Sequence, residues 1–267
     1  MADFLLAHEP ATRLAIFAGT FALMIVWEMA LPRKVRSLSR WARWPSNIGI
    51  VVLNTVVLRV IMPTTAVGFA LIAEANGWGL FNLVAVPQIV AILVSILLLD
   101  LAIYTQHVVF HAVPFLWRLH RMHHADQDID VTTGSRFHPI EILISMGIKL
   151  AVISILGAPA VAVLIFETVL NAAAIFNHAN VRLSPKLDSV LRLLIVTPDM
   201  HRVHHSIHRQ ETNSNFGFNL PWWDRIFATY TAQPMDGHDD MVIGIEHFRT
   251  VRDQRLDRMI VQPLRNV

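Results

Sequence analysis

The chain has 267 residues, of which 54% are hydrophobic and 16% are charged. Charged residues make up about a quarter of an ordinary soluble domain, so this composition, together with a mean hydropathy of +0.48, indicates a membrane protein. The absence of cysteine excludes disulfides, thiolate catalysis and cysteine-ligated zinc. A formal net charge of +2 is too small to indicate a nucleic-acid partner.

Five apolar runs follow one another along the chain, at about 13–31, 48–73, 80–106, 140–156 and 160–177. A helix that crosses a bilayer needs roughly 20 apolar residues, and the first three runs meet that length. The last two are shorter and are joined by a Gly-Ala-Pro segment, so 140–177 predicts either two tilted spans or one hairpin. The sequence therefore predicts an all-α integral membrane helical bundle of about four spans or the equivalent, forming a single domain over residues 1–267.

Basic residues are distributed unevenly between the loops. The loop after the first run contains Arg33, Lys34, Arg36, Arg40 and Arg43, whereas the loop between the second and third runs contains no Lys or Arg. Because cytoplasmic loops are rich in Lys and Arg, the first loop is predicted to be cytoplasmic. Alternation of the spans then places two further regions on the cytoplasmic face. They are a histidine-rich helical cap at about 107–138 and 178–231, and a polar tail at 232–267.

The motif His-Arg-X-His-His occurs twice, as HRMHH at 120–124 and as HRVHH at 201–205. On a helix, residues i, i+3 and i+4 share one face, so each motif is expected to direct three imidazoles to one point. HVVFH at 107–111 adds an i, i+4 pair, and His178 follows the fifth run. Neutral imidazole binds iron, zinc and copper well. One ion takes about four to six ligands, so nine histidines predict two metal ions.

Other metal sites fit this pattern less well. The zinc-protease motif HEXXH and the carboxylate-rich pattern of soluble di-iron bundles are both absent from the sequence. A haem site would place its histidines inside the spans. A non-enzymatic membrane metal-binding protein, such as a divalent-cation transporter, is the alternative function. It would need ligands in the middle of the bilayer, whereas these runs are long and apolar, with Arg59 and Lys149 as unexplained charges.

Four segments between residues 100 and 231 resemble the fatty acid hydroxylase superfamily, and in particular its sterol desaturase-like bacterial members. The segments are DLAIYTQHVVFHAVPFLWRLHRMHH, VTTGSRFHPIE, FNHANV and DMHRVHHSIHRQETNSNFGFNLPWWDRIFATY. The resemblance implies a bacterial inner-membrane enzyme with a non-haem di-iron centre and O2 as co-substrate, which hydroxylates or desaturates a C–H bond of a fatty acyl, sterol-like or isoprenoid lipid. Carried over by motif, the metal ligands are His107, His111, His120, His123, His124, His178, His201, His204 and His205.

The resemblance also implies cofactors and an electron donor. At one coordination position the chain departs from the pattern of some relatives. Two iron ions are expected, with zinc able to replace iron in recombinant protein because zinc stands above ferrous iron in the affinity order. The electrons are expected from an external ferredoxin- or cytochrome-type donor, since the chain has no flavin or cytochrome motif. Some relatives carry a histidine four residues before the one that matches His178, where this chain has Ala174. Water, Asn180 or His138 could fill that coordination position.

Five polar residues are expected to support the ligands rather than to bind metal: Asp100, His138, Asn180, Asp199 and His208. Asp100 shares a helical face with His107, and a metal-bound histidine commonly donates its other N–H to a carboxylate. His208 continues the face of 201–205 by one turn. His138 precedes Pro139, which is typical of a helix start. His238, near the end of the chain, is expected to have no role.

The orientation is testable by reporter fusion. A green fluorescent protein fused after Val267 is expected to fluoresce, and an alkaline phosphatase at the same point is expected to be inactive, because the positive-inside rule places this end in the cytoplasm. The same reporters inserted at residues 74–86 serve as the control and should behave in the opposite way. An active phosphatase after Val267 would contradict the predicted topology.

Overall fold

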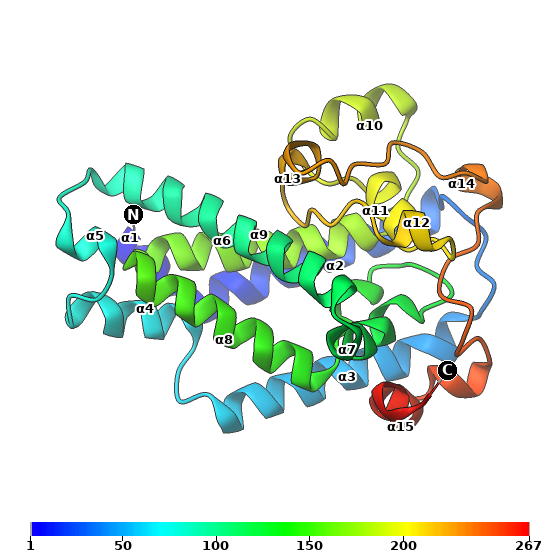
Figure 1. The fold of residues 1–267 in the computed structure, drawn as a ribbon, viewed down its shortest axis with the longest axis horizontal. Helices are drawn as coiled ribbons and strands as arrows, with labels where there is room; N and C mark the ends of the chain where they lie inside the picture. Colours follow the sequence, from blue (N-terminus) through cyan, green and yellow to red (C-terminus); the bar gives the residue numbers. More distant parts are fainter. Residues whose placement is uncertain (1, 267) are drawn as a thin grey trace.

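The computed structural model describes residues 2–266 and shows a bundle of helices (Figure 1). Its long helices are α2 (Glu9–Ala30), α3 (Arg40–Ile61), α6 (Gln88–Ala112), α8 (Pro139–Leu156) and α9 (Ala160–His178). The shorter helices are α1 (Ala2–Ala7), α4 (Ala66–Ala75), α5 (Leu80–Leu83), α7 (Pro114–His124), α10 (Pro185–Leu191), α11 (Pro198–His204), α12 (Arg209–Thr212), α13 (Trp222–Ile226), α14 (Gly237–Asp240) and α15 (Leu256–Val261). Three 3-10 turns complete the set: η1 (Thr133–Ser135), η2 (Val251–Gln254) and η3 (Gln262–Leu264). Within residues 2–266 only two isolated β-bridges form, so the predicted all-α membrane bundle is confirmed.

The long helices lie along the long axis of the molecule (Figure 1). The short helices α10 to α15 and the carboxy terminus gather at one end, and α4, α5 and the amino terminus lie at the other. Five helical segments are long and apolar enough to cross a membrane. The region 140–177, predicted as two spans or one hairpin, consists of two separate helices. Gly157, in the left-handed conformation at φ 64°, ends α8 as glycine commonly does.

The second apolar run differs from its expected extent at both ends. Helix α3 starts at Arg40, where Ser39 accepts a hydrogen bond from the amide of Ala42 and so caps the helix. It ends at Ile61, before Pro63, and the rest of the run forms α4 after a second cap at Thr65. Hydropathy did not reveal the first turns of α3, because they contain the charged Arg40 and Arg43 and the amide Asn47, of which Arg43 and Asn47 are buried inside the protein.

Helix α9 is the centre of the bundle. It contacts α2, α4, α6 and α11, and its Val163 and Phe166 pack with Leu99 of α6 and Ile153 of α8 in the main apolar core. More than half of its apolar stretch, 56%, is buried within the protein, against 11–28% for the other four candidate spans. The outward faces of those four are apolar and suit a lipid environment.

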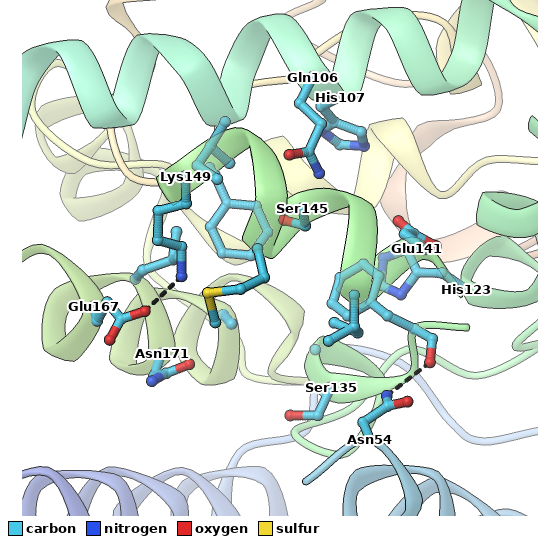
Figure 2. A pocket seen from close by; sticks show the side chains of 18 of the residues that line it. Asn54, Gln106, His107, His123, Ser135, Glu141, Ser145, Lys149, Glu167 and Asn171 are labelled. Atoms are coloured by element: carbon cyan, nitrogen blue, oxygen red, sulfur yellow. Dashed lines mark hydrogen bonds and ion pairs between the residues drawn. The ribbon is translucent and has the colours of Figure 1, made fainter. Parts of the chain in front are cut away.

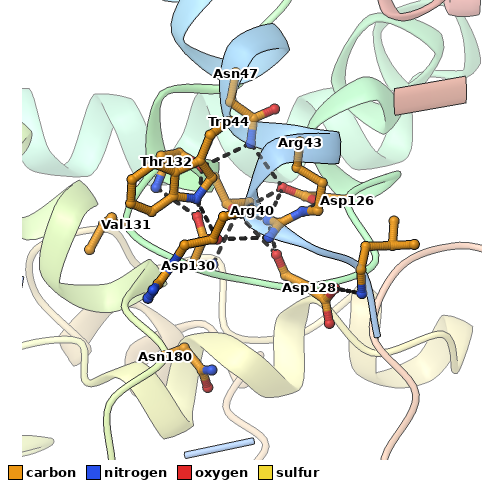
Figure 3. Close-up of polar contacts among 12 residues, drawn as sticks. Arg40, Arg43, Trp44, Asn47, Asp126, Asp128, Asp130, Val131, Thr132 and Asn180 are labelled. Carbon is orange, nitrogen blue, oxygen red and sulfur yellow. Dashed lines mark hydrogen bonds and ion pairs between the residues drawn. The ribbon is translucent and has the colours of Figure 1, made fainter. Parts of the chain in front are cut away.

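A buried ionic network joins the start of α3 to the loop after α7 (Figure 3). Arg43 Nε and Nη2 donate to the two carboxylate oxygens of Asp126 at 2.6 and 2.7 Å, and Nη1 donates to Asp130 at 2.7 Å. Thr133 Oγ1 donates to Asp126 as well, at 2.8 Å. Burial alone would raise the pKa of Asp126, but Arg43 and Arg136 lower it to about 2, so the carboxylate is charged. This network fixes the loop that leaves the histidine-bearing helix α7.

Replacing Arg43 with Met is expected to destabilise the protein strongly. Asp126 and Asp130 would lose their main partner, and removal of one member of a buried ion pair costs about 3–5 kcal/mol. Thermal unfolding in detergent measures the loss. Arg59→Met is the matched control, because it removes an exposed guanidinium from the same helix and should change stability by less than about 0.5 kcal/mol. Equal stability of the two variants would contradict the structural role of the network.

Candidate metal centre

The structure brings all nine predicted ligand histidines together, in two groups. The five-histidine group is His107, His111, His120, His124 and His204. The four-histidine group is His123, His178, His201 and His205. Within each group the candidate ligand atoms all lie within 4.8 Å of one another, and eight of the nine side chains are buried. Helices α6, α7, α9 and α11 supply them, from the end of the bundle at which the short helices gather (Figure 1).

Each His-Arg-X-His-His motif is divided between the two groups. On α7, His120 and His124 belong to the five-histidine group and His123 to the other; on α11, His204 belongs to the first and His201 and His205 to the second. The expectation that each motif directs three imidazoles to one point is therefore wrong. Successive residues of a helix are about 100° apart, so adjacent histidines diverge and one helix can serve two neighbouring sites.

The distances between ring nitrogens fit shared metal ions. His107 Nε2 lies 3.2 Å from His120 Nε2, and His178 Nε2 lies 3.1 Å from His123 Nε2 and 3.0 Å from His201 Nε2. Two nitrogens that each lie about 2.0–2.1 Å from one ion, at right angles, are about 3 Å apart.

Unpartnered nitrogens support the same conclusion. His111 Nε2, His124 Nε2, His204 Nε2 and both ring nitrogens of His205 are buried without a hydrogen-bond partner in the described chain. Buried polar atoms are nearly always partnered, so these nitrogens suit a group that the protein binds. The donor set therefore fits two metal ions.

Hydrogen bonds from the other ring nitrogen orient several of the imidazoles. The Nδ1 atoms of His107, His178 and His204 donate to the backbone carbonyls of Phe216 at 2.8 Å, Ala174 at 2.8 Å and Ser214 at 2.7 Å. Each bond fixes the tautomer and leaves Nε2 free to coordinate a metal.

A glycine brings a loop against one of these carbonyls. A Cβ atom at Gly134 would lie 2.4 Å from the carbonyl oxygen of Ala174, which accepts the hydrogen bond of His178. Only glycine permits this approach of the 126–138 loop to α9. The glycine in the segment VTTGSRFHPIE is thus required next to the four-histidine group.

Glu141 is a site residue that the sequence reasoning missed. Its Oε1 accepts from His120 Nδ1 at 2.6 Å, which is the carboxylate–histidine arrangement typical of metal sites. Figure 2 shows Glu141 beside His123 at the edge of a pocket. Asn213, whose Oδ1 accepts from His111 Nδ1 at 3.2 Å, was missed as well. The sequence did contain a signal for Glu141. The residue lies in the first turn of the helix that starts in FHPIE, three residues beyond His138.

Three of the buried histidines outside the spans are neutral near pH 7. Burial lowers the pKa of His124, His204 and His205 well below the usual histidine value, and repulsion from neighbouring imidazoles lowers it further. Neutral imidazole is the form that binds metal. The environment therefore keeps these side chains ready to act as ligands.

Two of the expected supporting residues have other partners. Asp100 accepts from Trp223 Nε1 at 2.8 Å and so holds the start of α13 against α6. His138 caps α8, with Nδ1 accepting from the amide of Ile140 at 3.2 Å. Among the described residues neither forms a hydrogen bond with a ligand histidine. His138 was also expected as a possible substitute at the position matching Ala174, and its bonds place it at the helix start instead.

The remaining three expected supporting residues hold loops. The side-chain amide of Asn180 exchanges hydrogen bonds with the backbone of Lys34, at 3.0 and 2.8 Å. Asp199 pairs with Arg33 at 3.2 Å. His208 is partly exposed and its Nε2 lies 2.6 Å from Asp236.

The surroundings of His238 differ from the polar, solvated ones that its neighbours in the chain suggest, while its expected lack of a role stays a prediction. It is buried, and its Nδ1 lies 4.0 Å from Asp199, so it packs in the cap rather than in solvent. The sequence reasoning placed it in polar surroundings from its neighbours in the chain, and the burial comes from residues far away in sequence.

Comparison with known proteins identifies the family. The fatty acid hydroxylase profile matches residues 92–229, just over half of the chain, and this range contains all nine histidines. The chain belongs to the fatty acid hydroxylase family.

The curated relatives include three lipid oxygenases. The chain is 31% identical over 161 residues to ornithine lipid hydroxylase OlsE of Rhizobium tropici, covering 60% of this chain and 46% of that protein. Human alkylglycerol monooxygenase is 30% identical over 149 residues, 55% of this chain and 31% of that protein. Human cholesterol 25-hydroxylase is 26% identical over 140 residues, which cover 52% of this chain and 50% of that protein. The chain thus spans half or less of each of these relatives, and no solved structure matches it.

Glu141→Gln is expected to weaken metal binding about 10–100-fold, because the neutral amide orients and polarises His120 less well than a carboxylate does. Competition with a chelator of known affinity measures the change in the purified protein. His208→Gln is the control, since His208 has its own exposed carboxylate partner outside the two groups. Unchanged affinity in Glu141→Gln would show that the bond to His120 does not support the site.

Proposed function

We propose that the two histidine groups bind two iron ions and that the chain is a membrane lipid hydroxylase that uses O2. One observation carries the proposal: two adjacent groups of buried histidines border a cavity of about 380 Å³ inside an apolar bundle. His107, His120, His123 and His201 line that cavity. The named activities of the relatives, an ornithine lipid hydroxylase, an alkylglycerol monooxygenase and a cholesterol 25-hydroxylase, support a lipid substrate.

The chemistry of hydroxylation gives the residues of this chain distinct roles. When bound, the iron pair supplies the activation of O2. One oxygen atom enters the broken C–H bond of the lipid to give an alcohol, and the other leaves as water with two protons and two electrons from an external ferredoxin- or cytochrome-type donor. Loss of a second hydrogen instead of oxygen insertion would give an alkene. The nine imidazoles hold the metals, Glu141 orients His120, and the apolar helices keep water from the reacting carbon.

The cation-transport alternative fits the structure less well. The ligand-bearing residues of α6 and α9 lie in the last turns of those helices, at 107–111 and 178, and the cap covers them. A transport site would require ligands near the middle of the spans. The location supports an enclosed catalytic centre, which we place on the cytoplasmic side of a bacterial inner membrane.

The function is testable by lipid analysis. Cells that lack the gene are expected to lose a hydroxylated or desaturated lipid that reappears with the wild-type chain. It should not reappear with His124→Ala or His204→Ala, because each removes a member of the five-histidine group. His208→Ala should keep most of the product, because His208 pairs with Asp236 outside the two groups. Variants are compared at equal membrane abundance.

Metal analysis of the same purified proteins provides the second readout. After reconstitution with iron, the wild-type chain is expected to hold two ions and His204→Ala fewer. One ion or fewer in the wild type would refute the dinuclear proposal. Identical lipid profiles with and without the gene, in a protein that holds both ions, would refute the hydroxylase assignment.

A further inference from the structure

The end of the cavity away from the histidines carries a buried ionic cluster. Lys149 of α8 donates to Glu167 Oε1 of α9 at 2.5 Å, and Arg13 of α2 donates to Glu167 Oε2 at 2.8 Å. All three residues line the cavity, and Lys149 and Glu167 are more than nine-tenths buried. Figure 2 shows Lys149 and Glu167 on one side of the cavity and His107 and His123 on the other. Charged residues at this depth of a membrane protein are costly and usually functional.

The cluster has unused hydrogen-bond donors at the cavity, and each carboxylate oxygen of Glu167 already accepts one hydrogen bond. Both carboxylate oxygens of Glu167 are occupied by the two cations, whereas an ammonium group has three donors and a guanidinium five. Within the described chain, the ammonium group of Lys149 makes one hydrogen bond. The guanidinium group of Arg13 binds only Glu167 and Glu9, both through Nη1. The free capacity at this end therefore suits an oxygen acceptor.

The charges of the cluster determine which oxygen acceptor suits it. Arg13 and Lys149 are balanced by Glu9 and Glu167, so the formal sum is zero. An additional buried anion would lack a compensating charge, and burial of an uncompensated charge is strongly unfavourable. The cluster thus favours a neutral carbonyl oxygen over a carboxylate.

The cavity lining on the side of the histidines is also partly polar (Figure 2). Asn54, which is buried, donates through Nδ2 to the carbonyl of Phe137, and its Oδ1 has no partner in the described chain. Gln106 Oε1 is likewise buried and unpartnered, and both residues line the cavity. A purely apolar ligand would leave these atoms unsatisfied, at a cost of about 1–3 kcal/mol each. The lining fits a ligand that carries polar atoms.

Helix geometry gives the distance between the cluster and the centre. Lys149 follows Glu141 by eight residues on α8, and Glu167 precedes His178 by eleven on α9. At a rise of 1.5 Å per residue these spacings correspond to roughly 12 and 16 Å along the helix axes. A lipid held at the cluster would therefore place a carbon far along its chain from the polar group beside the histidines.

We propose that Lys149 and Arg13 form a subsite for the ester or amide carbonyl of the lipid, and that this anchor selects the carbon that is oxidised. The subsite rests on the proposed function and specifies its substrate class: a lipid with a neutral ester or amide linkage. Glu167 positions the two cations, and Asn54 and Gln106 accept hydrogen bonds from hydroxyl or N–H groups of the same molecule.

A binding experiment tests the subsite without turnover. The iron-loaded protein, kept free of O2 in detergent, is titrated with radiolabelled methyl palmitate, palmitamide, palmitate and hexadecane. The ester and amide are expected to bind at least tenfold more tightly than hexadecane and more tightly than palmitate. Lys149→Met should abolish that preference, and Lys186→Met, which removes an exposed lysine, should retain it. No preference in the wild type, or its survival in Lys149→Met, would overturn the proposal.

A charge-neutral double variant tests whether a loss of binding results from misfolding. Lys149→Met combined with Glu167→Gln removes one cation and one anion, so no unpaired buried carboxylate is left. This double variant is expected to melt close to the wild type, to keep its metal content and to lose the preference for ester and amide. A folded double variant that keeps the preference would overturn the subsite.

Product analysis separates this proposal from the hydroxylase assignment. Over a series of methyl esters of increasing chain length, the oxidised carbon is expected to stay at a constant distance from the carbonyl, and the double variant should give scattered positions. Oxidation at a constant distance from the methyl end would overturn the subsite while the hydroxylase assignment stands. If no probe is oxidised, the hydroxylase assignment loses support, and the anaerobic binding preference still decides the subsite.

Discussion

The central constraint on this molecule is the clustering of nine imidazoles, eight of them buried, whose ring nitrogens face one another. Several of these nitrogens have no hydrogen-bond partner in the described chain, and others lie about 3 Å from a second ring nitrogen. Buried polar atoms without partners are unfavourable, and a charged cluster of imidazoles would be more so. In the proposed dinuclear centre, neutral rings around two shared cations satisfy both requirements. The imidazoles can share the cations only if the ends of α6, α7, α9 and α11 keep fixed positions relative to one another. Many of the other buried polar contacts fix these positions.

The buried arginines show how the register is kept. Arg43 ties α3 to the loop after α7 through Asp126 and Asp130. The arginine inside each repeated motif also joins distant segments. Arg121 donates to the carbonyl of Gln262 at 2.5 Å, and Arg202 donates to the carbonyl of Ala179, next to His178, at 3.3 Å. The motifs therefore combine candidate ligands with anchors to the tail and to α9. A chain poor in charge uses its arginines where the histidine-bearing segments meet.

The helical membrane bundle and the nine histidines could be predicted from the sequence, because hydropathy and helical spacing are local properties. The division of His123 and His124 between two groups could not, because it depends on where α11 and α9 lie relative to α7. Glu141 was missed although it ends the segment VTTGSRFHPIE, since its bond to His120 spans 21 positions. Asp100 was expected beside His107 from their shared face, but Trp223, 123 residues away, occupies its carboxylate. Contacts between distant segments account for each of these differences.

The central claim is that this chain holds two metal ions through histidine alone. X-ray absorption at the iron edge of the reconstituted protein tests it most directly, because scattering from imidazole rings is distinct from that of carboxylate or thiolate ligands. The account predicts a first shell dominated by imidazole, with four to five histidines per iron from groups of five and four, and a second iron as neighbour. A spectrum of an isolated iron with two or fewer imidazoles would contradict it.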